Sequence, residues 1–283
     1  MASALSLTPC QPTGKVETSQ TGATVGPLDD DAGRFQAWQL DALDARPPST
    51  RLLSTGPFRA LISADRSRGW MTLVERRPTE GETRDAVGRV RSELEGHQVG
   101  LEVEYNATVY PEVGAFLEAT GMRPERSDPL MACRPARFQP VTALDVTQRR
   151  LTPASYPADL EAFQTIRWTN GGDVRRPIPP IEQLRKELAS ETSVFLLAWV
   201  DGERCGTGVL HAVKGAAEIV GVVTRVDKRR RGVAAAVTSK LVADHFGVGG
   251  DFAFLNAAND MAVRVYQRLG FTWFGTNTVY TGR

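Results

Sequence analysis

Residues 217–236, AEIVGVVTRVDKRRRGVAAA, constrain the fold of this chain more than any other stretch. The apolar run 219–223 is rich in β-branched residues and has the length of a buried strand. A basic turn follows, and from Gly232 onward apolar residues recur near the 3.6-residue period of a helix. The sequence therefore predicts a strand, a glycine-containing loop and a helix. Free N–H groups and the helix dipole at such a helix start suit a phosphate or a pyrophosphate.

The loop differs from the two best-known phosphate-binding patterns. Neither GxGxxG nor GxxxxGK[ST] occurs here, and the residues present are Arg229-x-x-Gly232-x-Ala234. Gly232 allows the backbone to approach an anion closely, and the small side chain of Ala234 leaves the first helical turn unobstructed. Glu218 lies on the preceding predicted strand, eleven residues before Arg229.

A second pattern follows downstream, Asn259-x-x-Ala262-x-x-x-Tyr266-x-x-x-Gly270-Phe271. Together, in this order and at this separation, the two patterns resemble the signatures of the GNAT superfamily of acyl-CoA-dependent N-acetyltransferases. The resemblance covers about residue 144 to the C-terminus. It implies a GNAT fold of the mixed α/β (α+β) class, with a central mixed, mostly antiparallel sheet flanked by helices.

The resemblance also implies a function. We expect an acyltransferase that moves an acetyl group from acetyl-CoA directly to a primary amine of a small molecule or protein, through a ternary complex. The strand edge would pair with the pantetheine amides, and the loop would hold the pyrophosphate. The residues implied for cofactor binding are Val222, Val223, Thr224, Arg229, Arg230, Arg231, Gly232, Val233, Ala234, Asn256, Asn259 and Ala262.

Two residues are candidates for catalysis, and each has a second interpretation. Glu218 is the candidate base for the amine, and alternatively an exposed strand carboxylate. Tyr266 is the candidate acid toward the departing thiolate, and alternatively a core aromatic of an amphipathic helix. Asn259 is expected to contact the cofactor, to cap the helix that follows it, or both. A second function stays open: a non-catalytic acyl-CoA-binding sensor or assembly module.

Charge and composition restrict the partners. With 34 basic and 33 acidic residues, no overall field favours nucleic acid or an anionic membrane, and the basic run 228–231 is short and lacks interleaved aromatics. Apolar runs such as 194–200 are too short to span a bilayer, and the first residues lack a signal-peptide pattern. Three scattered cysteines favour a reducing, cytoplasmic compartment, and no metal-ligand spacing is present. Whether the chain forms a homodimer stays open.

The chain is expected to contain two related units. Residues 1–28 are predicted to be a poorly ordered tail, 29–135 a degenerate GNAT-like unit without a cofactor site, and 141–283 the acetyl-CoA-binding GNAT domain. The predicted succession of strand, Asn, helix, Gly and strand around 106–121 repeats around 256–270, which indicates a diverged duplication. The resemblance implies that the loop 169–180 of the second unit lines the acceptor site, but the mixed charges of the loop do not identify the acceptor.

Overall fold

The computed structural model describes residues 31–45, 50–63, 66, 68–94, 100–170 and 178–282. The predicted tail and residues 171–177 of the predicted acceptor loop lie outside these ranges. The strands are β1 (Thr50–Thr55), β2 (Phe58–Ser63), β3 (Gly69–Leu73), β4 (Leu101–Asn106), β5 (Arg123–Cys133), β6 (Val146–Arg150), β7 (Ser193–Val200), β8 (Glu203–Val213), β9 (Ala216–Thr224), β10 (Phe252–Asn256) and β11 (Thr272–Gly282). The helices are α1 (Asp31–Asp44), α2 (Glu80–Glu93), α3 (Val113–Ala119), α4 (Pro157–Asn170), α5 (Ile181–Leu188), α6 (Val233–Gly247) and α7 (Asp260–Arg268), with short 3-10 turns at Pro135–Arg137 and Val226–Lys228.

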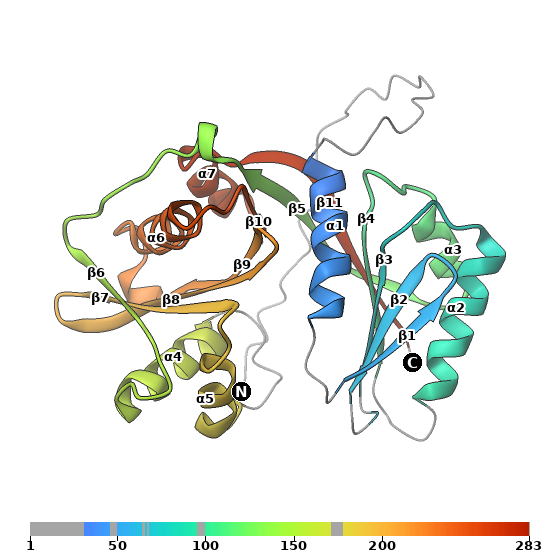
Figure 1. The fold of residues 1–283 in the computed structure, drawn as a ribbon, viewed down its shortest axis with the longest axis horizontal. Coiled ribbons are helices and arrows are strands. Elements are labelled where there is room, and N and C mark those ends of the chain that lie inside the picture. Colours follow the sequence, from blue (N-terminus) through green and yellow to red (C-terminus); the bar gives the residue numbers. More distant parts are fainter. Residues whose placement is uncertain are drawn as a thin grey trace, which may run out of the picture.

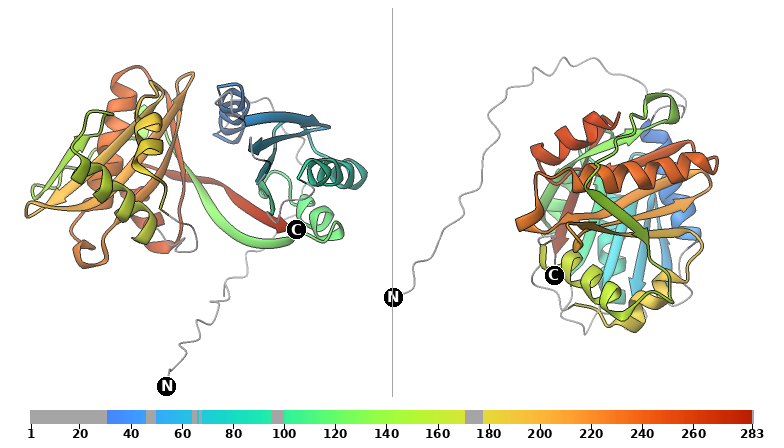
Figure 2. Two further views of the ribbon diagram at one scale, coloured as in Figure 1. Left: turned by 90° about the horizontal axis from the view of Figure 1, so that it is seen from below. Right: turned by 90° about the vertical axis from the view of Figure 1, so that its left-hand side faces the viewer.

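These strands form one sheet in which the two halves of the chain exchange their last strands. The order is β1-β2-β3-β4-β11-β5-β10-β9-β8-β7-β6. The last strand of the first half, β5, pairs with β10, whereas β11 from the second half lies between β4 and β5. Figure 2 shows β5 and β11 curving together from one half of the molecule into the other. The division into units 29–135 and 141–283 stays a prediction.

The sheet is mixed and mostly antiparallel, as the resemblance implied. Its only parallel pairs among the described strands are β3 with β4 and β9 with β10. In each half a helix connects the parallel pair, α2 in the first half and α6 in the second. The order β4, α3, β5 then matches the order β10, α7, β11, which supports the predicted tandem arrangement.

Helices cover both faces of the sheet, and α1 lies over its middle (Figure 1). On α1, Phe35 packs edge-on against Phe254 of β10, with ring centroids 5.1 Å apart. On the opposite face, α6 approaches β8 very closely because two positions of that strand are glycine. A Cβ at Gly206 would lie 2.4 Å from a methyl carbon of Val233, and a Cβ at Gly208 would lie 2.4 Å from one of Val237. These contacts fix the position of the N-terminus of α6.

Candidate functional site

The strands β9 and β10 separate part of the way along their length. They pair only where residues 216–218 meet residues 252–254, yet β9 continues to Thr224. No described strand pairs with β9 on this side beyond Glu218. The predicted residues Val222, Val223 and Thr224 lie on this free edge, and the hydroxyl of Thr224 is buried without a hydrogen-bond partner within the described ranges. The edge can therefore bind an extended chain that carries amide groups.

A bulge interrupts β9 within the free edge. Gly221 has φ of +60° at the point where the register with β8 shifts, and its carbonyl oxygen accepts a hydrogen bond from Thr207 (2.9 Å). The Arg167 side chain of α4 lies over this glycine, with Nε 3.2 Å from where a Cβ would be. Arg167 makes no ion pair with any described residue, and burial lowers its pKa. A cation of α4 that has no ion-pair partner among the described residues thus lies over the middle of the free edge.

The free edge leads to the N-terminus of α6. Gly232 is the N-cap residue, with φ of +78°, and no side chain caps the helix. The hydrogen bond from Ala236 N to Gly232 O (2.9 Å) is the first of the helix, so the N–H groups of residues 233–235 have no intrahelical acceptor. Arg230 also has a positive φ, of 64°. The loop therefore presents free N–H donors at the positive end of a helix dipole.

The basic residues of this loop differ in whether an acidic side chain already pairs with them or leaves them free to bind an anion. Arg231 forms an ion pair with Asp201, and Lys228 forms one with Glu203 (2.9 Å). Arg229 and Arg230 are exposed and have no acidic partner in the part of the chain that the structure describes. Of the three arginines implied by the resemblance, Arg229 and Arg230 are therefore available to an anion, and Arg231 is already neutralised.

The corresponding helix of the first half, α2, has a closed N-terminus. The Thr79 hydroxyl accepts a hydrogen bond from Glu82 N (3.2 Å), and the Glu82 carboxylate accepts one from Thr79 N (2.9 Å). Arg76 also bonds to Glu82, which lowers the pKa of that carboxyl to about 2. A bound anion would have to displace the carboxylate that the chain itself supplies.

The candidate base Glu218 is half-buried on β9. It makes no hydrogen bond or ion pair with the described residues. Burial raises its pKa to about 8, and the nearby Glu104 carboxylate of β4 adds to the increase. In the sheet Glu218 lies opposite His211, whose Nδ1 is 2.8 Å from the Ser193 hydroxyl. Glu218 can therefore take up and release a proton close to neutral pH.

The histidine beside Glu218 was not singled out by the sequence patterns. Burial and, to a smaller extent, the charge of Arg167 lower the pKa of His211 to about 4. His211 is therefore neutral at physiological pH. Its place next to Glu218 depends on strand register, which no local motif encodes.

The candidate acid Tyr266 lies on α7 in the core, 7% exposed, with its ring centroid 5.9 Å from that of Phe271. Burial raises the pKa of Tyr266 to about 12, so the hydroxyl keeps its proton. Asn259 caps α7, because its side-chain oxygen accepts a hydrogen bond from Ala262 N (3.0 Å). Asn256 ends β10, and its side-chain oxygen is buried without a partner in the described structure.

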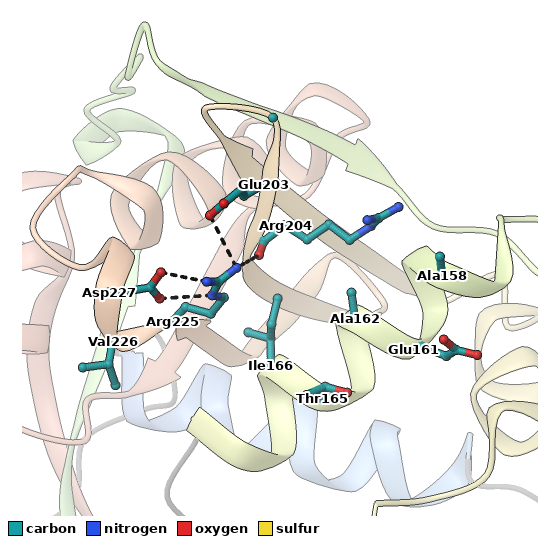
Figure 3. Close-up of a pocket in the computed structure, with 11 residues that line it drawn as sticks. Ala158, Glu161, Ala162, Thr165, Ile166, Glu203, Arg204, Arg225, Val226 and Asp227 are labelled. Carbon is teal, nitrogen blue, oxygen red and sulfur yellow. Dashed lines mark hydrogen bonds and ion pairs between the residues drawn. The ribbon is translucent and has the colours of Figure 1, made fainter.

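A pocket of about 890 Å³ lies beside the loop, between α4 and the starts of β8 and the basic turn (Figure 3). Two of its lining arginines are paired, Arg225 with Asp227 (2.7 Å) and with Glu203 (3.8 Å), and Arg204 with Asp159 (2.6 Å). Its lining contains neither candidate catalytic residue and no predicted cofactor-binding residue; it consists of Ala158, Glu161, Ala162, Thr165, Ile166, Gly202, Glu203, Arg204, Arg225, Val226 and Asp227. The free edge of β9 is therefore a separate feature of the surface.

Two other kinds of site are absent from the described residues. No group of three or more His, Cys, Asp or Glu side chains there is arranged to hold a metal ion. None of the described helices combines the length and the apolar character that crossing a bilayer requires.

Known proteins resemble this chain in sequence and in fold. Residues 160–271 match the family model described as "Acetyltransferase (GNAT) family", and no curated protein matches the chain. A GCN5-related N-acetyltransferase from Kribbella flavida superposes with a TM-score of 0.72 at 22% identity, over 89% of this chain and 96% of that one. A GCN5-related N-acetyltransferase from Sphaerobacter thermophilus superposes with a TM-score of 0.62 at 18% identity, over 81% of this chain and 82% of that one.

A third similar structure is itself a tandem protein. The tandem GNAT protein from the clavulanic acid biosynthesis pathway superposes with a TM-score of 0.61 at 14% identity, over 90% of this chain and 96% of that one. These likenesses extend over both halves of the chain, including the half that lies outside the family match. Residues 160–271 therefore resemble the acetyltransferase (GNAT) family, and the chain has the fold of the GCN5-related N-acetyltransferases.

Proposed function

We propose that this protein is an acetyl-CoA-dependent N-acetyltransferase that acts directly on a primary amine of a small molecule or protein, through a ternary complex. The observation that carries the proposal is the free edge of β9, which leads into the uncapped N-terminus of α6. Pantetheine is an extended chain with amide groups, and it ends in a pyrophosphate. The edge and the helix start present the matching groups in the same order.

Different parts of the site would hold different parts of the cofactor. The backbone at Gly232, Val233 and Ala234 would hold the pyrophosphate, helped by the side chains of Arg229 and Arg230, which have no acidic partner among the described residues. The edge at 222–224 would pair with the pantetheine. Asn256, Asn259 and Ala262 would border the opposite side, where β10 leads into α7. Because Asp201 neutralises Arg231, we assign Arg231 to fixing the loop and not to the phosphates.

Acetyl-CoA, when bound, supplies an acetyl group activated as a thioester. Glu218 would take a proton from the acceptor amine, and a pKa of about 8 suits it to this exchange near neutral pH. Tyr266 would hold a proton on its hydroxyl for the departing sulfur, since a pKa of about 12 keeps it protonated. Holding both substrates in one orientation would contribute the rest of the rate increase.

The first test is thermal unfolding with and without acetyl-CoA. At about one hundred times its dissociation constant, the ligand should stabilise the protein by about 2.7 kcal/mol, a shift on the order of 5 °C or more. Gly232→Val should abolish the shift because a side chain obstructs the loop. Gly121→Val is the matched control: Gly121 has the same positive φ, of 79°, and no atoms within 4 Å of its Cβ position.

Two outcomes contradict parts of the proposal. A folded wild-type protein whose melting temperature does not respond to acetyl-CoA would refute the cofactor assignment. A shift without CoA release, across a broad panel of amines, would favour the non-catalytic acyl-CoA sensor. Loss of CoA release in Tyr266→Phe, with the thermal shift retained, is the result expected if Tyr266 is the acid.

A further inference from the structure

Arg167 of α4 is a half-buried cation whose side chain has no partner in the described structure. It makes neither a hydrogen bond nor an ion pair with any described residue, although burial disfavours its charged form and lowers its pKa. The other half-buried arginines among the described residues each donate a hydrogen bond to a carboxylate or a carbonyl oxygen: Arg34, Arg59, Arg91, Arg134, Arg185, Arg204 and Arg225. A charge that is taken out of water without a partner destabilises the fold. Arg167 is therefore suited to an acceptor that does not come from the described chain.

The Arg167 side chain lies directly against the backbone of the free edge of β9. Its Nε, Cδ and Cζ atoms are 3.2, 3.7 and 3.8 Å from the position that a Cβ at Gly221 would occupy. Only a residue without a side chain lets the guanidinium come this close. Along β9, Gly221 follows Glu218 by three residues and directly precedes residues 222–224. The guanidinium thus lies over the stretch between the candidate base and the part of the edge assigned to pantetheine.

Arg167 and the candidate base Glu218 are on the same face of the sheet. His211 lies directly opposite Glu218, so the two side chains point to the same face. The His211 ring packs edge-on against Phe195, with centroids 6.3 Å apart, and Phe195 belongs to the core that α4 and α5 cover. Glu218 therefore lies on the α4 side, as Arg167 does. Three extended residues span at most about 10 Å, which limits the separation between Glu218 and Gly221 along the strand.

The charged and titratable groups around Arg167 leave its charge uncompensated. Glu187 of α5 acts on the pKa of Arg167 but forms no ion pair with it, and its carboxylate accepts a hydrogen bond from Gln183 (3.3 Å). His211 is neutral, with Nδ1 2.8 Å from the Ser193 hydroxyl. No described carboxylate therefore competes with an external anion for this guanidinium.

A carboxylate of the acceptor fits this position better than a phosphate of the cofactor. The pyrophosphate is assigned to the start of α6, beyond residues 222–224, where Arg229 and Arg230 are exposed without an acidic partner among the described residues. Arg167 lies on the other side of residues 222–224, toward Glu218, where the acceptor amine would react. A planar guanidinium also matches the two oxygens of a carboxylate with two parallel hydrogen bonds.

We propose that Arg167 binds a carboxylate of the acceptor, and that the substrates are amino acids whose reacting amine is separated from this carboxylate by a short carbon chain. This inference rests on the proposed acetyltransferase function. At the amine, the N–C bond forms as the C–S bond of the thioester breaks. One proton passes from the amine to Glu218, Tyr266 supplies one to the sulfur, and exchange with water then restores both groups. The carboxylate on Arg167 keeps its charge throughout.

The test compares acceptors that differ only in the carboxylate, by steady-state CoA release: 4-aminobutanoate with 4-aminobutanamide, and 6-aminohexanoate with 6-aminohexanamide. Wild type should use at least one of the acids about ten times more efficiently than its amide, as expected for one charge-assisted hydrogen bond. Arg167→Met keeps an unbranched stem and removes the charge. It should raise KM for the preferred acid about 10- to 100-fold. Its KM values for acetyl-CoA and for the amide should change by less than about twofold, because neither needs the Arg167 charge.

Two further variants sharpen the result. Arg167→Lys keeps the charge without the planar fork and should recover part of the KM for the acid. Arg150→Met removes one positive charge at an exposed position of β6, the strand at the edge of the sheet, and should leave the KM values for acids and amides unchanged. The comparison of acid and amide in wild type involves no variant, so it tests the inference even if Arg167→Met folds poorly.

The outcomes separate this inference from the proposed function. Equal use of acid and amide by wild type at both chain lengths would overturn the carboxylate site and leave the acetyltransferase standing. An equal loss with acid and amide in Arg167→Met would overturn the site as well, because it would mean that Arg167 does not act on the carboxylate. Failure of acetyl-CoA to shift the melting temperature of the wild type would remove the proposed function, and the carboxylate site with it.

Discussion

The raised pKa of Glu218 makes a prediction about stability that does not depend on catalysis. The group titrates at about 8 in the folded protein and near the usual 4.5 in the unfolded chain. Between these values the folded state holds a proton that the unfolded state has lost, so the free energy of unfolding falls as the pH rises. The contribution of Glu218 to the free energy of unfolding is fully present below about pH 4.5 and is lost above about pH 8. Glu218→Gln removes this dependence because glutamine does not titrate.

The size of the effect follows from the two pKa values. Between pH 5 and pH 9 the wild type should lose about 4 kcal/mol of unfolding free energy relative to Glu218→Gln, and about 2.5 kcal/mol of this by pH 7. The histidines and cysteines of the unfolded chain also titrate in this range, but they are the same in both proteins. The difference between the two curves therefore isolates Glu218.

The assay is urea unfolding followed by far-UV circular dichroism at pH 5, 7 and 9, without acetyl-CoA. The midpoint of the wild type should fall with pH relative to that of Glu218→Gln. Glu125→Gln, which removes an exposed carboxylate, should follow the wild type. Parallel curves for wild type and Glu218→Gln would refute the argument, because they would mean that Glu218 titrates alike in the folded and unfolded states.

Three further predictions concern the second half of the chain. Gly270→Ala should lower the free energy of unfolding by at least about 2 kcal/mol. Gly270 has φ of +91°, and a Cβ there would lie 1.9 Å from the Arg137 carbonyl oxygen. A melting temperature equal to that of the wild type would contradict this prediction. Asn259→Ala should cost about 1 kcal/mol by removing the cap of α7, whereas Asn259→Ser should restore most of it, as measured by urea unfolding. Deletion of residues 272–283 should leave β4 and β5 without the strand between them and prevent cooperative unfolding; a sharp thermal transition in the deleted protein would show that the first half closes its own sheet.

Local patterns in the sequence predicted most of the helices and strands. Alternating apolar residues in 58–63, and the helical period after Gly232, correspond to β2 and α6. The strand β1 was not predicted, because Thr50–Thr55 contains only two apolar residues and lies at the edge of the sheet. Edge strands bury little side chain, so their hydrophobic signal is weak.

The candidate site was predictable only where a local motif encodes it. The loop at Gly232 and the cap at Asn259 follow from short-range geometry, and the structure has both. Glu104 could not be found in this way. It occupies a polar position in the alternating strand LEVEYN, a pattern that equally describes a face exposed to water. Its partners Trp70 and Asn277 lie on the neighbouring strands β3 and β11, and no local motif encodes that arrangement.

The strand exchange gives the first half a structural role that does not require a cofactor site. Every residue from Phe252 to Leu255 of β10 is at most 1% exposed, and beyond its short pairing with β9 the strand depends on β5. Without β5, β10 would present an apolar edge, which is a template for aggregation. The first half, in which Glu82 caps the N-terminus of α2, thus still supplies β5 to the sheet of the second half.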